Sequence, residues 1–306
     1  MLRPETIIHY GIRENPFSPS RLKSREDVLK TQEHYLASRR IIKAARDCEL
    51  LLLIGRQGTG KSTALSSAEE ELRSTGVDIS RFGLADSPSS GTMVNLLIDE
   101  MARCKGIAYG GYDRQKKLNL IKKSLQASSH GSLLIAIDDG HVLPGETLLS
   151  IKRKWDNLVF GFRHLVGIVI LCQESIYTNL NSTGLREFDQ HVEKYEMLGL
   201  IHPDEVHQYI AKRCEGFFGW SIESGSWRQT RPGAWDSVID PLVPVKIWEL
   251  YKKRPDSPMQ SDIQQIEPRR LNAIMVGLLN YGAASGAPKI TADLVEHYSS
   301  SFGSYY

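Results

Sequence analysis

The sequence predicts an α/β fold in which a parallel β-sheet is flanked by helices. Short apolar runs alternate with helical patterns from Leu50 to Leu200, as they do in chains that form parallel sheets. A glycine-rich segment joins the first run to a helix, and two carboxylates end a later run. Polar groups at such positions fall at the carboxyl edge of the sheet, where open α/β sheets bind ligands.

The composition is that of a globular protein. The chain has 306 residues, 41% of them hydrophobic, which suffices for one large domain or for a core with a smaller appendage. The net charge of +2 is too small to indicate a nucleic-acid partner by itself. No C-x-x-C pair occurs among the four cysteines, so neither a zinc site nor a disulfide framework is indicated.

The sequence also bears on the compartment. No apolar run approaches the ~20 residues of a membrane-spanning helix, and the polar amino-terminal residues do not resemble a secretion signal. We therefore expect a cytoplasmic protein without a membrane partner.

The most specific motif is a phosphate-binding loop. Residues 55–62 match G-x-x-x-x-G-K-[ST] between an apolar strand, residues 50–54, and a helix, residues 64–72. Its glycines permit positive φ angles, so that backbone N–H groups can surround phosphate oxygens at the positive end of the helix. A chance glycine turn before an ordinary helix is the alternative, and the flanking strand and helix argue against it. The predicted nucleotide-binding residues are Gly55, Gln57, Gly58, Thr59, Gly60, Lys61, Ser62 and Thr63.

Within this motif, two side chains have distinct predicted roles. Lys61 reaches the β- and γ-phosphates, and the Ser62 hydroxyl ligates Mg²⁺.

Two carboxylates end the apolar strand at residues 132–139. Asp138 is predicted to hold Mg²⁺ through its waters, and Asp139 to orient or deprotonate the attacking water. A turn would also explain an Asp-Asp-Gly sequence, although the upstream phosphate loop favours the metal site. Gln173, at the end of the strand at residues 166–173, is either a sensor of the γ-phosphate or an ordinary polar strand terminus.

The remaining patterns predict two more strands and a series of helices. The strands are expected at residues 77–85 and 195–200. Helices are expected at residues 31–47, from 92 onward, and at 113–125, 146–159, 202–213, 245–253, 268–281 and 291–299. Residues 221–244 are predicted to be an irregular insertion whose tryptophans serve packing rather than ligand binding.

Taken in order, several short motifs resemble the ExeA/TniB/TnsC-like AAA+ ATPases. They are YGIRENPF at residues 10–17, the phosphate loop, IDDGHVL at 137–143, LREF at 185–188 with YEMLGL at 195–200, and EPRRLN at 267–272. The resemblance covers nearly the whole chain except the insertion. It implies a lead-in segment at residues 1–30, an AAA+ core at 31–200 and a small helical lid at 201–306, with the insertion at about 221–244.

The resemblance also implies ATP as the nucleotide, bound with Mg²⁺ between neighbouring subunits of an oligomer. By position, Arg269 is similar to the lid's sensor arginine, with Arg270 as the adjacent candidate. Arg186 is similar to an arginine finger that reaches the next subunit, the alternative being a surface salt bridge. His191 stands where relatives tend to have arginine, which weakens that prediction if the missing arginine is the true finger.

A second departure is Asp139, since the family usually has glutamate there. Aspartate is one methylene shorter than glutamate, so its carboxylate lies roughly 1.5 Å further from the attacking water. Misplacements of that size cost on the order of a hundredfold in rate. A slow ATPase with a persistent ATP-bound assembly is the resulting expectation.

Among these relatives, the short members resemble regulators of transposition, which assemble with ATP on DNA and link target selection to the transposase. The implied partners are double-stranded DNA, transposase and target-selection proteins, and further copies of the chain in a ring or helical filament, all in the bacterial cytoplasm. The basic residues then become candidates for contacts with the DNA backbone, where they would otherwise form a solvated helix face. They are Lys116, Lys117, Lys122, Lys123, Lys152, Arg153 and Lys154.

Two other functions are compatible with the same motifs. One is an ExeA-type secretion ATPase, which the lack of a transmembrane segment or wall-binding pattern in the sequence disfavours. The other is a stand-alone signalling or defence NTPase that responds to a protein partner.

Overall fold

A computed structural model describes residues 1–18, 25–84, 89–108, 113–127, 133–180, 185–223, 226–231, 234–253 and 263–302. The chain forms two compact units. The first, here the sheet unit, consists of Gln32–Arg56 and Gly60–Met197. The second, here the helical unit, consists of Met1–Thr31, Gln57–Thr59 and Leu198–Tyr306.

A five-stranded parallel sheet forms the centre of the sheet unit, with strand order β2-β3-β6-β1-β7. The strands are β1 (Leu50–Ile54), β2 (Asp78–Gly83), β3 (Leu133–Asp138), β6 (Val166–Cys172) and β7 (Glu193–Glu196). Ile54 lies opposite Cys172, and Gly83 lies opposite Asp138, so the carboxyl ends of these strands meet at one edge. The predicted parallel sheet is confirmed.

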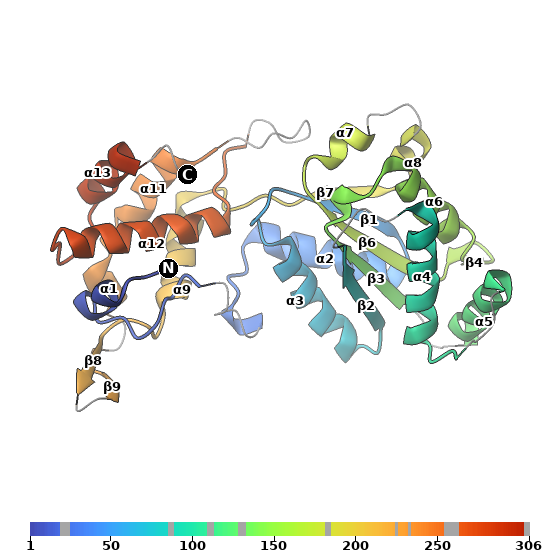
Figure 1. Ribbon diagram of the computed structural model, residues 1–306, viewed down its shortest axis with the longest axis horizontal. Helices are drawn as coiled ribbons and strands as arrows, with labels where there is room; N and C mark the ends of the chain where they lie inside the picture. Colours follow the sequence, from blue (N-terminus) through green and yellow to red (C-terminus); the bar gives the residue numbers. More distant parts are fainter. Residues whose placement is uncertain are drawn as a thin grey trace. The chain divides into compact units, whose positions relative to one another are not determined.

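Helices cover both faces of this sheet (Figure 1). Leu51 and Leu53 of β1 pack in a core with α2 (Gln32–Asp47) and α3 (Lys61–Ser74). The alternate residues of β1 pack in a second core with the helices of the other face. Those helices are α4 (Ser90–Cys104), α5 (Arg114–Ala127), α6 (Gly145–Asp156), α7 (Ile176–Leu180) and α8 (Arg186–His191). Because β1 is buried on both faces, its sequence is a continuous apolar run.

Trp155 joins the end of α6 to two strands of the sheet. Its indole N–H lies 2.8 Å from the carbonyl oxygen of Val166 and 3.1 Å from that of Cys48, and the ring stacks on His164 at 3.5 Å. Both acceptors lie next to the amino ends of β6 and β1, so this one side chain fixes α6 against them.

The predicted helix at 146–159 ends earlier, at Asp156. Residues beyond it form a small antiparallel ribbon of β4 (Val159–Phe160) and β5 (Arg163–His164), with Gly161 at φ 61° in the turn. The prediction was wrong at its carboxyl end because Val159, although apolar, is exposed and belongs to this ribbon.

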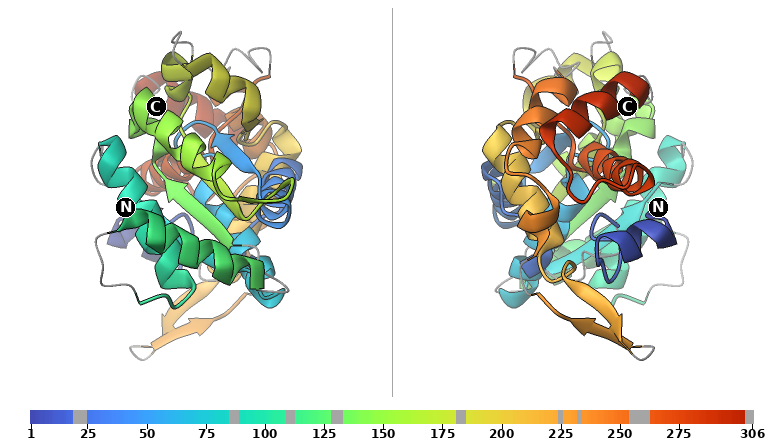
Figure 2. Two further views of the ribbon diagram at one scale, coloured as in Figure 1. Left: turned by 90° about the vertical axis from the view of Figure 1, so that its right-hand side faces the viewer. Right: turned by 90° about the vertical axis from the view of Figure 1, so that its left-hand side faces the viewer.

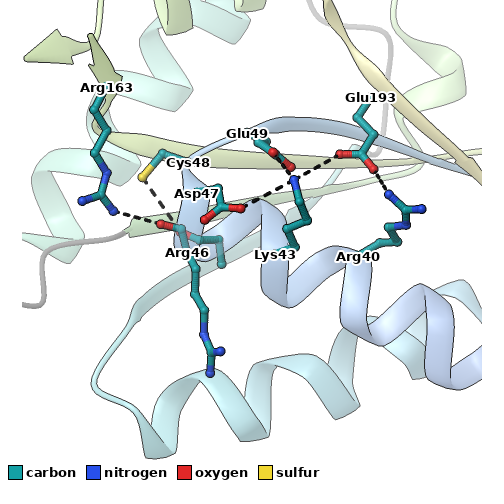
Figure 3. A network of polar contacts seen from close by, with 9 residues as sticks. Arg40, Lys43, Arg46, Asp47, Cys48, Glu49, Arg163 and Glu193 are labelled. Carbon is teal, nitrogen blue, oxygen red and sulfur yellow. Dashed lines mark hydrogen bonds and ion pairs between the residues drawn. The ribbon is translucent and has the colours of Figure 1, made fainter. Parts of the chain in front are cut away.

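A network of charged side chains ties α2 to the starts of β1 and β7 (Figure 3). Lys43 pairs with Glu49, with Asp47 at 3.5 Å and with Glu193 at 3.9 Å, while Arg40 pairs with Glu193. The Glu49 carboxylate raises the pKa of Lys43. Burial and the nearby Glu193 together raise the pKa of Glu49 in spite of Lys43. Exposed pairs of this kind add little stability individually, so the network mainly orients α2.

The helical unit combines both ends of the chain. It contains α1 (Pro4–His9), the 3₁₀ turn η2 (Arg25–Asp27), α9 (Pro203–Cys214), α10 (Trp235–Val238), α11 (Val243–Tyr251), α12 (Pro268–Ala284) and α13 (Ala292–Phe302). The Thr6 hydroxyl of α1 donates to Asn280 of α12 at 2.8 Å, so the amino-terminal helix is bound to the carboxyl-terminal part of the chain (Figure 1).

Part of the predicted irregular insertion has regular structure, which corrects the prediction. An antiparallel ribbon, β8 (Trp220–Glu223) with β9 (Ser226–Gln229), projects from the helices of this unit (Figure 2). Its first residue, Trp220, donates its backbone N–H to Gly11 at 2.9 Å and lies under the guanidinium of Arg13 at 4.8 Å. Trp235 and Trp248 pack against the core of this unit.

Among the described residues, no helix combines the length and the hydropathy needed to cross a membrane.

Candidate nucleotide-binding site

The phosphate loop joins the carboxyl end of β1 to the first turn of α3. Gly58 and Gly60 have φ angles of 89° and 106°, a region that disfavours residues with a Cβ. A Cβ on Gly58 would also lie 2.4 Å from the Cβ of Arg269. Residues 57–59 and Arg269 both belong to the helical unit. Lys61 begins α3, so the free N–H groups and the positive end of this 14-residue helix face the loop.

Lys61 is held at the base of the loop. Its ammonium group donates to the carbonyl oxygens of Gly55 at 2.8 Å and Arg56 at 2.9 Å. Burial lowers the pKa of Lys61, an effect that Asp138 and other nearby acidic groups oppose. A partly buried ammonium attracts phosphate oxygens more strongly than a fully solvated one, because charges interact more strongly at lower dielectric.

Ser62 and Asp138, the two predicted magnesium ligands, lie side by side. The Ser62 hydroxyl donates to Asp138 Oδ2 at 3.3 Å, and the other carboxylate oxygen accepts the backbone N–H of Asp139 at 3.1 Å. Mg²⁺ favours hard oxygen ligands from hydroxyl and carboxylate groups. These two groups therefore fit the predicted metal.

Asp139 is exposed and has a left-handed backbone conformation, with φ 57° and ψ 31°. The next residue is a glycine for a packing reason, because a Cβ on Gly140 would lie 2.1 Å from the Ile170 side chain. The Asp-Asp-Gly sequence thus places one carboxylate beside Ser62 and lets the following turn pack against β6.

Arg81 was not predicted as a site residue. It lies on β2, and its guanidinium donates to Asp138 Oδ2 at 2.8 Å and to the Ser66 hydroxyl of α3 at 3.2 Å. The signal in the sequence was slight: a single cation two residues before the end of the strand that pairs with β3. Only the register of β2 against β3 shows that so long a side chain reaches the carboxylate.

Gln173 follows the last residue of β6, at the same edge of the sheet. The carbonyl oxygen of its neighbour Cys172 accepts the backbone N–H of Gly55 at 3.2 Å, which places the end of β6 beside the start of the loop.

Arg186 is the first residue of α8, and its side chain lies outside the described part of the structure. The finger role of Arg186 therefore stays a prediction.

Arg269 and Arg270, in the first turn of α12, have different surroundings. Arg269 is exposed, and its backbone N–H donates to the Gly58 carbonyl at 3.3 Å. Arg270 donates to the Tyr251 carbonyl at 2.8 Å, so its guanidinium is directed into the helical unit. Of the two, Arg269 has the side chain that is available to a ligand.

The predicted DNA-contacting cations are similarly divided. Lys152 is buried, with a relative exposure of 6%, and pairs with Asp156 at 2.7 Å. It is therefore removed from the candidates for contact with DNA. Lys117 pairs with Asp99 and is only partly exposed, and the exposed Lys116 lies 3.9 Å from Asp113. The cations without an ion pair to any described carboxylate are Lys122, Lys123, Arg153 and Lys154.

Comparison with known proteins agrees with this geometry. Residues 44–180 match the model of an AAA domain family, AAA_22. The fold is that of an AAA+ P-loop NTPase. No curated protein matches the sequence. The AAA domain match and the fold together support ATPase activity.

Several solved structures are similar to this chain in fold. Cdc6p from Pyrobaculum aerophilum has a TM-score of 0.57 and 18% identity, over 95% of this chain and 71% of that one. The ORC2 protein of Aeropyrum pernix, solved as ADPNP and ADP complexes, has a TM-score of 0.53 and 15% identity. The match covers 95% of this chain and 72% of the ORC2 chain. Drosophila ORC bound to DNA has a TM-score of 0.48 and 10% identity, over 96% and 64%.

Proposed function

We propose that this AAA+ ATPase is an ATP-dependent, DNA-binding regulator of transposition. It oligomerises on target DNA, recruits the transposase and is disassembled by ATP hydrolysis. The observation that carries the ATP-dependent part is the arrangement of Lys61, Ser62 and Asp138 at the carboxyl edge of the sheet. The order of motifs shared with the TniB and TnsC-like proteins supports the role in transposition.

The chain's own residues divide the proposed chemistry among them. The loop N–H groups and Lys61 bind the phosphates, while Ser62 and Asp138 hold the metal. Mg²⁺, when bound, supplies positive charge to the phosphate oxygens. Asp139 orients or deprotonates the attacking water, and Gln173 hydrogen-bonds that water or the γ-phosphate. In the same proposal, Arg269 senses the γ-phosphate and Arg186 acts on the nucleotide of a neighbouring subunit.

The proposed DNA contacts are made by cations of α5 and α6 that have no ion pair to a described carboxylate. These cations are Lys122, Lys123, Arg153 and Lys154. Lys116 of α5, which is only weakly paired with Asp113, is included with them. Contacts of lysine and arginine with phosphates give affinity without sequence readout and make binding dependent on salt. Binding to duplexes of unrelated sequence with similar affinity is the consequence.

A filter-binding assay with duplex DNA tests this function. The wild-type protein is expected to bind DNA with a nonhydrolysable ATP analogue and to bind poorly without it. Lys61→Ala should abolish both ATP-dependent assembly and hydrolysis, whereas Asp139→Asn should block hydrolysis and preserve assembly. DNA binding that is absent, or that is the same with and without nucleotide, contradicts the proposal.

A charge variant tests the DNA surface separately. Replacing Lys122 and Lys123 by alanine should weaken binding to all duplexes and reduce the slope of log affinity against log salt by about 1 for each lost phosphate contact. The matched control is Lys43→Ala on α2, which removes a lysine on the opposite face of the sheet. An equal loss of affinity in both variants would argue against a specific surface.

A further inference from the structure

The metal-binding carboxylate already has a cationic partner within the chain. Arg81 donates to Asp138 Oδ2, the same oxygen that accepts the Ser62 hydroxyl. The second carboxylate oxygen is engaged by the backbone of Asp139. Arg81 therefore lies on the side of Asp138 that faces the predicted metal ligand Ser62.

Arg81 is held in this position from two sides. One guanidinium nitrogen donates to Asp138 and another to the Ser66 hydroxyl, which in turn donates to the carbonyl oxygen of Ser62 at 2.9 Å. Arg81 and Asp138 have side-chain exposures of only 32% and 23%, so water screens the pair less than it screens a fully exposed one. The contact is a charge-assisted hydrogen bond, which is the stronger class.

We propose that Arg81 competes with Mg²⁺ for Asp138 and thereby sets the Mg²⁺ concentration at which the site takes up the metal. The proposal rests on the proposed ATP-binding function. A carboxylate oxygen that already accepts a hydrogen bond from a guanidinium has less negative charge to offer to a divalent cation. Metal uptake is therefore coupled to movement of the Arg81 side chain away from Asp138.

The experiment measures the Mg²⁺ concentration that gives half-maximal change in the affinity for a fluorescent, nonhydrolysable ATP analogue. Affinity is first measured in EDTA and then during a Mg²⁺ titration. Arg81→Ala should lower the midpoint by about tenfold, the factor expected when one charge-assisted contact is lost. Arg81→Lys should fall between this variant and the wild type.

A second variant separates a direct contact from a general effect of charge. Ser66→Ala removes the second anchor of Arg81 without changing the charge of the protein, so a direct competition predicts a midpoint lowered in the same direction. A general electrostatic effect predicts no change in this variant. Arg39→Ala, which removes an exposed cation paired with Glu71 of α3, is the control and should leave the midpoint unchanged.

Three outcomes overturn the inference. A midpoint that is unchanged or raised in Arg81→Ala refutes it, and so does a midpoint in Ser66→Ala that equals the wild-type value. In both cases, nucleotide binding by the wild type in EDTA leaves the proposed function intact. Failure of the wild-type protein to bind the analogue at any Mg²⁺ concentration overturns the proposed function, and the inference with it.

Discussion

Asp139 shows how backbone conformation restricts the choice of a catalytic carboxylate. Its left-handed φ and ψ angles are tolerated by aspartate and asparagine better than by other residues with a Cβ. A glutamate would extend the carboxylate by one methylene, but it lacks the short side chain that favours this conformation. The aspartate found here is compatible with its backbone conformation.

Substitution of Asp139 tests the effect of carboxylate reach on the rate of hydrolysis and the effect of the backbone conformation on stability. Asp139→Glu should increase the rate of ATP hydrolysis, because the carboxylate extends further, and should lower the free energy of unfolding by about 1 kcal/mol, because of the backbone conformation. Asp139→Asn should abolish hydrolysis without changing stability. Steady-state turnover and chemical denaturation give the two readouts. A wild-type turnover above about 10 s⁻¹, or a slower Asp139→Glu enzyme, contradicts the idea that the short carboxylate limits the rate.

At the residue scale, the sequence predicted the groups whose type and spacing are fixed by chemistry. Lys61, Ser62 and Asp138 belong to a motif that requires those residue types, and the structure brings them together. Arg81 escaped prediction because an arginine in a strand usually faces solvent. Its contact with Asp138 depends on the pairing of two strands that are distant in the sequence.

At the scale of elements, the Trp155 side chain connects α6 to the central strands of the sheet. Its single N–H is shared by two backbone carbonyl groups next to the central strands, and both acceptors are buried. Loss of a buried hydrogen bond leaves these acceptors unsatisfied.

Trp155→Phe should therefore lower the free energy of unfolding by about 1–3 kcal/mol, as measured by urea denaturation. Trp227→Phe is the matched control, because Trp227 lies on the β8–β9 ribbon and is 36% exposed. It should change stability by less than about 0.5 kcal/mol. Equal effects of the two substitutions would show that the shared hydrogen bond adds nothing.

The central strands β1, β3 and β6 were predictable because each is a short apolar run, whereas the two ribbons were not. Two-residue strands such as Val159–Phe160 have no periodicity to detect. Their apolar side chains instead continued the pattern of the preceding helix. In the β8–β9 ribbon, serine and glycine are interspersed with tryptophan, which favours an irregular prediction.

At the scale of the whole molecule, segments far apart in the sequence form one unit. Thr6 and Asn280 are hydrogen-bonded, and Tyr10 packs in the same core as residues of α12. No local pattern in residues 1–18 indicates this pairing, because periodicity describes a helix and not its partner. The composition of the unit could therefore not be read from the sequence.

The four cysteines test the burial in both units at once. All are free thiols; Cys104 is partly exposed, whereas Cys48, Cys172 and Cys214 are buried. In the folded protein, a thiol-specific reagent should therefore modify Cys104 first, slowly at pH 7 and faster toward alkaline pH because burial raises its pKa.

Burial also raises the pKa of Cys172, to about 12, so this thiol should stay unreactive until the protein unfolds. Labelling followed by peptide mass spectrometry measures the order, and Cys104→Ser is the control that should remove the first modification. Early modification of Cys172 would show that the edge of the sheet opens readily.

The strand order has a consequence for assembly. β2 and β7 are the two outer strands of the sheet, and they carry charged side chains such as Asp78, Arg81, Glu193 and Lys194. Charges on outer strands oppose the addition of a strand from another molecule. Copies of this chain are therefore expected to associate through side chains of helices and loops rather than through a shared sheet, which allows an assembly to form and dissociate without backbone pairing.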